Sequence, residues 1–280
     1  MGKIAWRALL VGALLAFLFA VLFPLYWMAI SSTKTFKELF SIVPVFWPSE
    51  FTPKAYKAVL TSPAREIPDL LDGLRNSLVV SGATVFVALA LGTLAAYAIA
   101  RLRFRGKTAV TALVLIVYLF PAILLMVPLF AMFAMVELHN SLRGLVVAYL
   151  AQTLPVSLLV LGNYFRSIPA EIEEAALVDG CSRPGVIWRV TIPLSVPAIA
   201  SVALYVFMIA WNEFLFAYIL LSDPKKFTAP VYISYLHSQL HTPWNQVMAA
   251  SVLVTVPVII LFTCFMKWIE KGLTAGGIKE

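Results

Sequence analysis

One ionisable side chain lies inside an apolar run long enough to cross a membrane. It belongs to Glu213, in the sequence Trp211-Asn212-Glu213-Phe214. A charge in the hydrocarbon core is costly and usually faces a polar partner or a water-filled cavity. Two roles therefore fit Asn212 and Glu213: they line a translocation path, or they make structural hydrogen bonds between helices. The sequence favours the structural role and leaves both open.

The other patterns that suggest chemistry are incomplete. Gly106-Lys107-Thr108 resembles the end of a phosphate-binding loop, but the full motif needs a glycine where Arg101 stands. The stretch Gly180–Gly185 misses the nucleophile-elbow pattern by one residue and lacks its preceding strand. The sequence therefore predicts no catalytic residue and no cofactor-binding residue, and the chain is not expected to be an enzyme.

The histidines and cysteines give no sign of a metal site. Cys181 and Cys264 lack metal-ligand spacing and are too few for a disulfide framework, so we expect both to be reduced and structural. His139, His237 and His241 fall in or beside predicted external loops, where a polar surface role is the simplest interpretation. No metal-binding residue is predicted.

The composition is that of an integral membrane protein. Of the 280 residues, 61% are hydrophobic and 12% are charged, roughly half the charged share of a soluble domain. This excludes a soluble globule, a disordered chain and a disulfide-rich secreted module. A net charge of +7 would suggest nucleic-acid binding in a soluble protein, but here the excess of basic residues fits the cytoplasmic side of a membrane. Membrane lipid is an expected partner, and nucleic acid is not.

Six apolar runs are long enough to form transmembrane helices, because about 20 helical residues cross the hydrocarbon core. They predict an all-α integral membrane protein with one transmembrane domain over residues 1–280. Kinks are expected at Pro121 and Pro128 in the third run. The first run has no cleavage site and is expected to be a retained anchor. The runs are Ala8–Ile30, Leu78–Ala100, Ala109–Val136, Gly144–Leu161, Leu194–Leu221 and Val247–Met266.

The positions of the basic residues predict the orientation. Twelve of the 21 lysines and arginines fall in the two termini and in the connections after the second and fourth runs. Three fall in the short loops on the other side, and the long loop Ser31–Asn76 holds six together with five acids. Because short cytoplasmic loops are enriched in basic residues, we expect both termini in the cytoplasm.

The segment 162–193 lies on the predicted cytoplasmic side and is too polar to span a membrane. Pro169 suits a helix start and Gly180 suits a C-terminal cap, so a short helix is expected from Pro169 to Asp179. Acidic residues in its early turns suit the helix dipole. A second short helix is expected to open at Ser182.

One face of the first internal helix is small and partly apolar. It carries Ile172, Ala175, Ala176 and Asp179, at the spacing i, i+3, i+4 and i+7. This face either packs on the protein's own helices or forms a compact knob for a groove on a cytoplasmic partner. The spacing alone leaves both interpretations open.

The internal segment resembles the EAA loop of ABC importer permeases. That motif reads Glu-Ala-Ala, three residues, Gly, nine residues, then Ile-x-Leu-Pro. This chain has Glu174-Ala175-Ala176, then Gly180, then Val190-x-Ile192-Pro193. Valine and isoleucine in place of isoleucine and leucine are mild departures.

Other stretches narrow the resemblance to carbohydrate-uptake permeases. Arg75–Leu78, Trp211–Phe214 and the tail Lys271–Gly277 are similar to the smaller permease subunit of maltose-type transporters. The resemblance covers essentially the whole chain, and the long external loop is its least specific part.

The resemblance implies one subunit of a larger, binding-protein-dependent importer. A second, different permease subunit would pair with this chain, and two ATPase subunits would hold ATP and Mg on the cytoplasmic side. An extracytoplasmic sugar-binding protein would deliver the sugar substrate, expected to be a di- or oligosaccharide. No cofactor is expected in this chain. The assembly would lie in the cytoplasmic (inner) membrane of a prokaryote.

The resemblance also implies sites. The internal helix would dock on an ATPase subunit and couple its closure to alternating access, and the tail Gly272–Glu280 would reach the ATPase dimer. The external segment Ser222–Gln246 would reach toward the binding protein. No sugar-binding residue is implied. The residues expected in ATPase coupling are Glu174, Ala175, Ala176, Asp179, Gly180 and Pro193, and those expected to contact the binding protein are Tyr232, Tyr235 and Trp244.

A stand-alone secondary transporter is the alternative function, since it too would have several spans and an intramembrane acid such as Glu213. It would need a complete ion or proton site within one chain, and a single acid within a span is weak evidence of such a site. A membrane enzyme would need a catalytic constellation. Polyamine and anion permeases share the internal loop but fit the tail and Asn76-Ser77-Leu78 less well.

Overall fold

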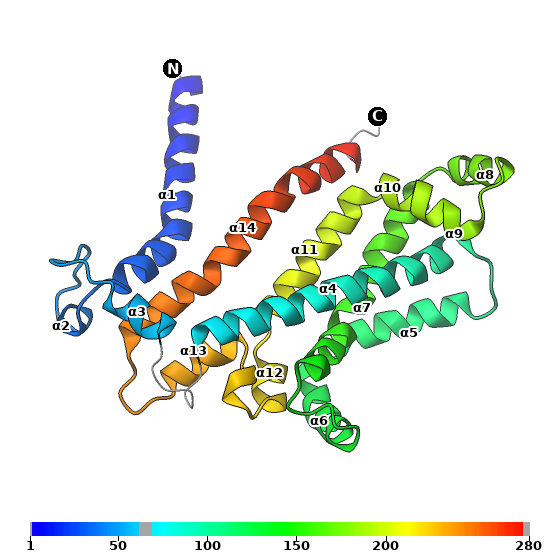
Figure 1. The fold of residues 1–280 in the computed structure, drawn as a ribbon. Helices are drawn as coiled ribbons and strands as arrows, with labels where there is room; N and C mark the ends of the chain where they lie inside the picture. The colour runs from blue at the N-terminus through cyan, green and yellow to red at the C-terminus, as the bar shows by residue number, and fades with distance from the viewer. Residues whose placement is uncertain (1, 62–68, 277–280) are drawn as a thin grey trace. The chain divides into compact units, whose positions relative to one another are not determined.

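The computed structural model describes residues 2–61 and 69–276, with the backbone alone for Gly2, Ala5 and residues 268–276. Every regular element in these ranges is a helix, as the sequence predicts (Figure 1). The elements are α1 (Gly2–Ser31), α2 (Phe36–Leu39), α3 (Lys54–Leu60), α4 (Leu70–Arg101), α5 (Lys107–Leu119), η1 (Ala122–Leu125), α6 (Met126–Met135), α7 (Leu142–Ser167), α8 (Ala170–Val178), α9 (Arg183–Val186), η2 (Ile187–Thr191), α10 (Ile192–Leu194), α11 (Val196–Asn212), α12 (Leu215–Leu220), η3 (Pro224–Lys226), α13 (Ala229–His237) and α14 (Trp244–Gly276).

Within the described ranges, four single helices are long and apolar enough to cross a membrane. Two further pairs of helices pass the same test together: α5 with η1 and α6, bent by 93°, and α9 to α10 with α11, bent by 80°. The described helices therefore provide up to six spans, the predicted number, when each bent pair is counted as one. The four single spans are Trp6–Ser31, Leu70–Arg101, Leu142–Ser167 and Trp244–Lys267.

The chain divides into two compact units. The first unit comprises Met1–Leu71 and Tyr232–Val256, and the second comprises Asp72–Val231 and Pro257–Glu280. The expectation of a single transmembrane domain over residues 1–280 stays a prediction.

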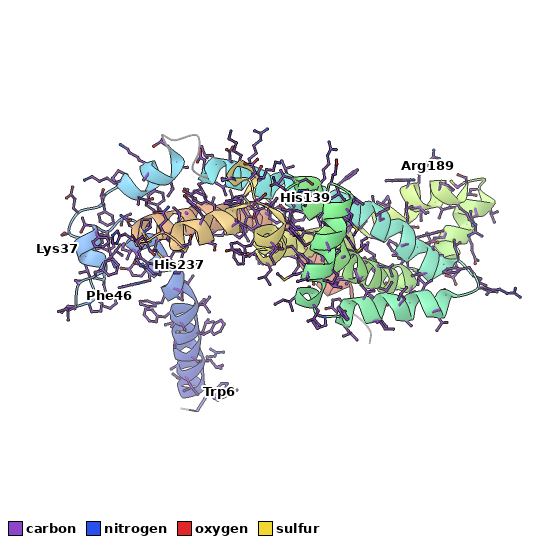
Figure 2. All side chains as sticks on the ribbon, turned by 90° about the horizontal axis from the view of Figure 1, so that it is seen from below. Trp6, Lys37, Phe46, His139, Arg189 and His237 are labelled. Atoms are coloured by element: carbon purple, nitrogen blue, oxygen red, sulfur yellow. The ribbon has the colours of Figure 1, made fainter. Side chains whose placement is uncertain are left out.

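In the first unit, α1 carries apolar side chains on all sides. The most apolar window of its candidate span is 0% buried by the rest of the chain. Figure 2 shows Trp6 at one end of α1, and Lys37 and Phe46 near the other end. A helix that is apolar all round needs hydrocarbon or another protein chain against it. The first unit by itself does not supply these surroundings.

The segment after α1, predicted only as a long external loop, has its own short helices and hydrogen bonds. Thr35 begins α2 with a capping box, in which its N–H and hydroxyl donate to Glu38 Oε2 at 3.0 and 2.9 Å. The Ser49 hydroxyl and N–H donate to Glu38 Oε1 at 2.6 and 2.9 Å. These four hydrogen bonds, led by that of the Ser49 hydroxyl, lower the pKa of Glu38 to about 2. Residues 62–68 of the predicted loop lie outside the described residues.

In the second unit, α4, α7 and α11 pack around a shared core. Tyr97 of α4, Phe165 of α7 and Val206 of α11 belong to one buried cluster. α4 and α7 approach closely at Gly92, where an added Cβ would lie 3.1 Å from the Ser157 Cβ. Figure 1 shows α8 to α10 gathered at one end of α7, and α6 and α12 at its opposite end.

The end of the fourth span differs from the prediction. α7 continues to Ser167, whereas the apolar run ended at Leu161. Phe165 lies among polar residues in the sequence but is fully buried in the core, so tertiary packing extends the helix beyond the hydropathy signal. Residues 162–167, predicted to belong to the internal segment 162–193, are therefore the last residues of α7.

The third and fifth apolar runs contain breaks. The third separates at Pro121, where a kink was expected, whereas Pro128 lies within α6. In the fifth, α11 starts after the 80° bend and ends at Asn212, and α12 begins at Leu215. Hydropathy registers an apolar stretch but not the local backbone direction, so the sequence could not place the breaks in the fifth run.

The close approach at Gly92 yields a test of the α4–α7 packing. Gly92→Val should separate these helices and lower stability by about 1–3 kcal/mol, because side-chain atoms would enter a filled contact. Gly82→Val is the matched control: Gly82 lies on the same helix with nothing within 4 Å of an added Cβ. Thermal unfolding of the two variants in the same detergent measures the difference, and equal melting temperatures would contradict the packing.

Candidate functional site

The internal helix α8 forms as its local sequence predicts. Pro169 stands at its N-cap position and Asp179 at its C-cap. Gly180 follows with φ +89°, a left-handed conformation that glycine adopts without strain. The Gly180 N–H donates to the Leu177 carbonyl at 3.1 Å and the Cys181 N–H to the Ala176 carbonyl at 3.0 Å, which together make a Schellman cap. These local bonds fix where α8 stops and where the chain turns.

The segment after the turn is also partly predicted. The Ser182 hydroxyl accepts the Gly185 N–H at 3.3 Å and caps α9. The chain then continues through the π-helical η2 into α10, which contains the exposed Pro193. The π-helical turn was not foreseen, because its residues carry no signal that distinguishes it from an α-helix.

The carboxylate of Glu173 anchors α8 to the rest of the second unit. Its side chain is 7% exposed and its Oε1 accepts from Arg101 Nε at 3.1 Å, forming an ion pair. The Thr191 hydroxyl donates to the same oxygen at 3.1 Å, and the Tyr97 hydroxyl donates to Oε2 at 3.3 Å. Arg101 also donates to the Ile168 carbonyl at 2.7 Å. One acid thus ties α8 to the end of α4 and to η2.

The outer face of α8 is free of contacts that would bury it. Glu174, Ala175 and Asp179 are exposed, and Ala176 is half-buried. The apolar Ile172 and Val178 are 44% and 87% exposed. The face 172–179 is thus covered only in part by the protein's own helices, and its docking on a partner stays a prediction.

Sequence reasoning missed the role of Glu173. It counted this residue as a helix-dipole charge and Arg101 as a basic loop residue, and they lie 72 positions apart. The signal that could have suggested the pair is periodicity, since Glu173, Ala176 and Leu177 share the half-buried side of α8. No local pattern, however, names Arg101 as the partner.

Glu213 makes structural hydrogen bonds, but they are local to the backbone that follows it, whereas the role expected from the sequence was hydrogen bonding between helices. Its carboxylate accepts the N–H groups of Phe216 and Ala217 at 2.9 and 3.1 Å, which caps α12 after the break. Asn212 is exposed, and its side-chain amide donates to the Met208 carbonyl at 2.8 Å. Both oxygens of the acid are thus used to satisfy backbone donors, and the translocation-path role stays a prediction.

Two residues of the Arg75–Leu78 stretch hold the segment before α13 in place. The Asn76 amide donates to the carbonyls of Lys225 and Phe227 at 2.9 and 3.0 Å. The Ser77 hydroxyl accepts the Ala229 N–H at 2.9 Å. The start of α4 thereby fixes the chain that leads into α13, a role that the sequence did not reveal.

The three aromatic residues predicted to contact a binding protein differ in exposure. Tyr232 is 4% exposed, and burial, followed by the Asp69 and Tyr235 charges, raises its pKa to about 12. Such a side chain offers little surface to a partner. Tyr235 and Trp244 are half-buried, and Trp244 packs edge-on against His237 at 5.4 Å between ring centroids. The contact stays a prediction, better suited to Tyr235 and Trp244.

Within the described ranges, no group of three histidine, cysteine or acidic side chains is arranged to hold a metal ion. Of the tail predicted to reach the ATPase dimer, residues 277–280 lie outside the described part of the chain.

Comparisons with known proteins agree with the resemblance of residues 162–193 to the EAA loop of ABC importer permeases. Over residues 88–275 the chain matches the family described as "Binding-protein-dependent transport system inner membrane component". It is 41% identical over 263 residues to the inner membrane ABC transporter permease protein YcjP of Escherichia coli (strain K12), with 94% of this chain and 93% of that protein covered. It is 36% identical over 279 residues to the trehalose/maltose transport system permease protein MalG of Thermococcus litoralis, covering 97% and 96%.

The fold is similar to that of a chain in the crystal structure of a bacterial ABC transporter involved in the import of the acidic polysaccharide alginate. The TM-score is 0.83 at 23% sequence identity, with 95% of this chain and 97% of that chain covered. This likeness concerns the arrangement of the helices.

The anchoring of α8 yields a second test. Glu173→Gln removes the charge that Arg101 faces, and losing one partner of a buried ion pair lowers stability by about 3–5 kcal/mol. Glu174→Gln is the matched control, because Glu174 is exposed on the same helix. Thermal unfolding should separate the two variants clearly. A Glu173→Gln protein that melts with the control would show that the ion pair does not anchor α8.

Proposed function

This chain belongs to the family of binding-protein-dependent transport system inner membrane components, and we propose that it is one permease subunit of an ATP-driven sugar importer. The observation that carries this proposal is the geometry of α8. Its exposed face is free, while its opposite face is tied by Glu173 to the end of α4. A helix of this kind suits the transfer of motion from a cytoplasmic partner into the membrane helices.

The partners follow from that role. Two ATPase subunits would bind ATP and Mg, and α8 would dock on one of them through Glu174, Ala175, Ala176 and Asp179. A second, different permease subunit would complete the path, and an extracytoplasmic binding protein would deliver the substrate. This chain would hold no cofactor of its own.

The coupling is a shift between two populations. ATP can drive the importer only by binding the closed ATPase pair more tightly than the open pair. Closure would displace α8, and the Glu173 ion pair would carry the displacement to α4 and η2. Gly180 and Pro193 would set the directions of the chain on either side of that connection.

The substrate we propose is a di- or oligosaccharide. The support is the 36% sequence identity to the trehalose/maltose permease of Thermococcus litoralis, which extends over 97% of this chain. Both termini would lie in the cytoplasm of a prokaryote, because twelve of the 21 lysines and arginines fall on that side in short segments.

The turn after α8 provides a test of coupling. Gly180→Pro cannot adopt φ +89° and loses the N–H bonded to Leu177. Uptake by the assembled importer should fall to background, and the binding protein should no longer stimulate ATP hydrolysis, while the subunit stays in the membrane. Gly180→Asn is the control, since asparagine tolerates a left-handed conformation and should retain uptake. Normal sugar uptake by Gly180→Pro would contradict the docking role of α8.

The composition of the complex tests the proposed function as a whole. The tagged chain is purified from its native membranes in mild detergent, and co-purifying proteins are identified by mass spectrometry. Recovery of a second permease and a soluble ATPase is expected. Recovery of the chain alone, folded and able to transport in liposomes without ATP, would overturn the proposal in favour of a secondary carrier.

A further inference from the structure

The first unit buries a positive charge that has no anion beside it. Lys34, just after α1, is 1% exposed, and its ammonium lies 3.8 Å from the centroid of the Trp27 ring. Among the described residues, it makes no ion pair and its ammonium donates no side-chain hydrogen bond. A buried ammonium normally has acceptors for its three donors, because leaving them unpaired is costly. The Trp27 ring supplies only a cation–π contact.

The nearest acid cannot supply the missing acceptor. Both oxygens of Glu38 already accept two hydrogen bonds each, from Thr35 and Ser49. Glu38 contributes at longer range, since burial lowers the pKa of Lys34 and the Glu38 charge partly offsets this effect. The Lys34 ammonium is thus left with free donors on the side away from Glu38.

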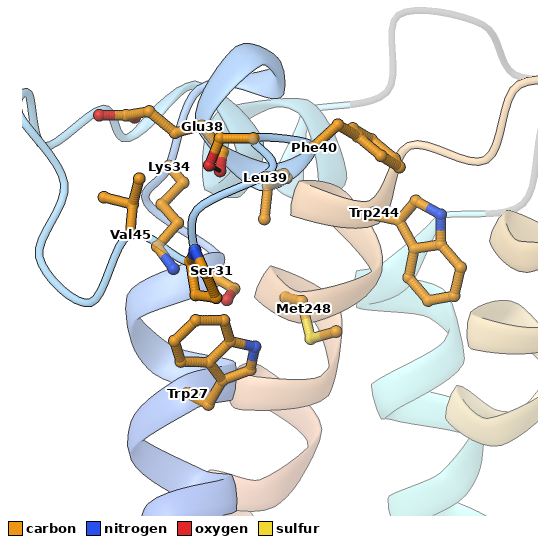
Figure 3. A pocket seen from close by; sticks show the side chains of 11 residues that line it. Trp27, Ser31, Lys34, Glu38, Leu39, Phe40, Val45, Trp244 and Met248 are labelled. Atoms are coloured by element: carbon orange, nitrogen blue, oxygen red, sulfur yellow. Dashed lines mark hydrogen bonds between the residues drawn. The ribbon is translucent and has the colours of Figure 1, made fainter.

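A pocket of about 260 Å³ lies where these donors are. Figure 3 shows the Lys34 ammonium and the Ser31 side chain together above the Trp27 ring. The Ser31 hydroxyl is buried and has no hydrogen-bond partner, which gives the pocket a second unpaired polar group. Glu38 and Ser41 also line the pocket, and both Glu38 oxygens are occupied by the hydrogen bonds from Thr35 and Ser49. Most of the other lining side chains are apolar, among them those of Val45 and Met248.

We propose that this pocket binds the phosphate of a phospholipid headgroup, with Lys34 and Ser31 as its donors. An ammonium and a hydroxyl suit a phosphate oxygen, and apolar walls suit the adjoining glycerol and acyl carbons. The source is lipid because the pocket lies at the end of α1, a helix long and apolar enough to cross a membrane. The proposed function places the start of α1 in the cytoplasm, so this pocket at its other end would face the headgroups on the opposite side of the same membrane. That placement rests on the proposed function.

Aromatic residues at the same end of α1 agree with an interfacial position. Trp27 packs against Phe46 at 5.6 Å between ring centroids, and the Tyr26 hydroxyl donates to the Phe46 carbonyl. Tryptophan and tyrosine are enriched where a membrane helix meets the headgroups. Trp244, at the start of α14, lines the pocket as well, so a bound headgroup would join the end of α1 to α14 within the first unit.

The test is native mass spectrometry of the complete importer in detergent. The added probes are dioleoylphosphatidylglycerol, dioleoylglycerol without phosphate, and inorganic phosphate. Lys34→Met should reduce bound phosphatidylglycerol by about tenfold or more, because a charge-assisted contact is lost. Lys37→Met should bind as the unchanged protein does, since Lys37 is exposed on α2. Lys34→Arg should retain binding, and Ser31→Ala should weaken it less than Lys34→Met.

The outcomes separate the sources of the phosphate. Equal lipid retention by Lys34→Met and Lys37→Met would overturn the proposal, as would equal binding of dioleoylglycerol. Lys34-dependent binding of inorganic phosphate without binding of the lipid would overturn the lipid source. Lys34→Met should fold, because it removes a buried charge rather than leaving one unpaired. Sugar uptake, measured separately, reports on the proposed function and not on this pocket.

Discussion

The buried carboxylate of Glu173 is the constraint on which the end of the second unit that carries α8 depends. A carboxylate removed from water must be paired and hydrogen-bonded, and here Arg101, Thr191 and Tyr97 satisfy it from α4 and η2. The same requirement makes α8 rigid relative to α4. It also decides which side of α8 faces inward. The small side with Ala175 and Asp179 is left outside, where a partner can reach it.

The breaks in the apolar runs follow a related rule. Backbone donors freed at a break within a membrane must be satisfied inside the protein. Glu213 does so for the first N–H groups of α12. At the ends of the helices near α12, the Asn140 side chain accepts the N–H groups of Ser222 and Asp223 at 3.2 and 3.1 Å. Polar residues in and near the spans thus serve the backbone first, which is why a lone intramembrane acid is weak evidence of an ion site.

Local signals predicted what local bonds determine. The start of α8, its end at Gly180 and the cap at Ser182 depend on residues within a few positions, so the sequence placed them correctly. Hydropathy found the apolar runs for the same reason. It missed the extension of α7 to Ser167, which depends on the burial of Phe165 against α4 and α11. It also missed the Arg101–Glu173 pair, because contacts distant in sequence leave no local pattern.

Some polar groups of the chain are paired within it, whereas other groups and surfaces are left for the membrane or for partners. Three acids that fix the local backbone geometry are fully paired: Glu173, Glu213 and Glu38. Where surroundings are expected from outside, groups stay unpaired: the apolar sides of α1, the outer face of α8, and the Lys34 ammonium. A subunit that is complete only in a membrane and with partners should show this division. In the first unit, the apolar sides of α1 and the Lys34 ammonium would then be the places at which lipid acts.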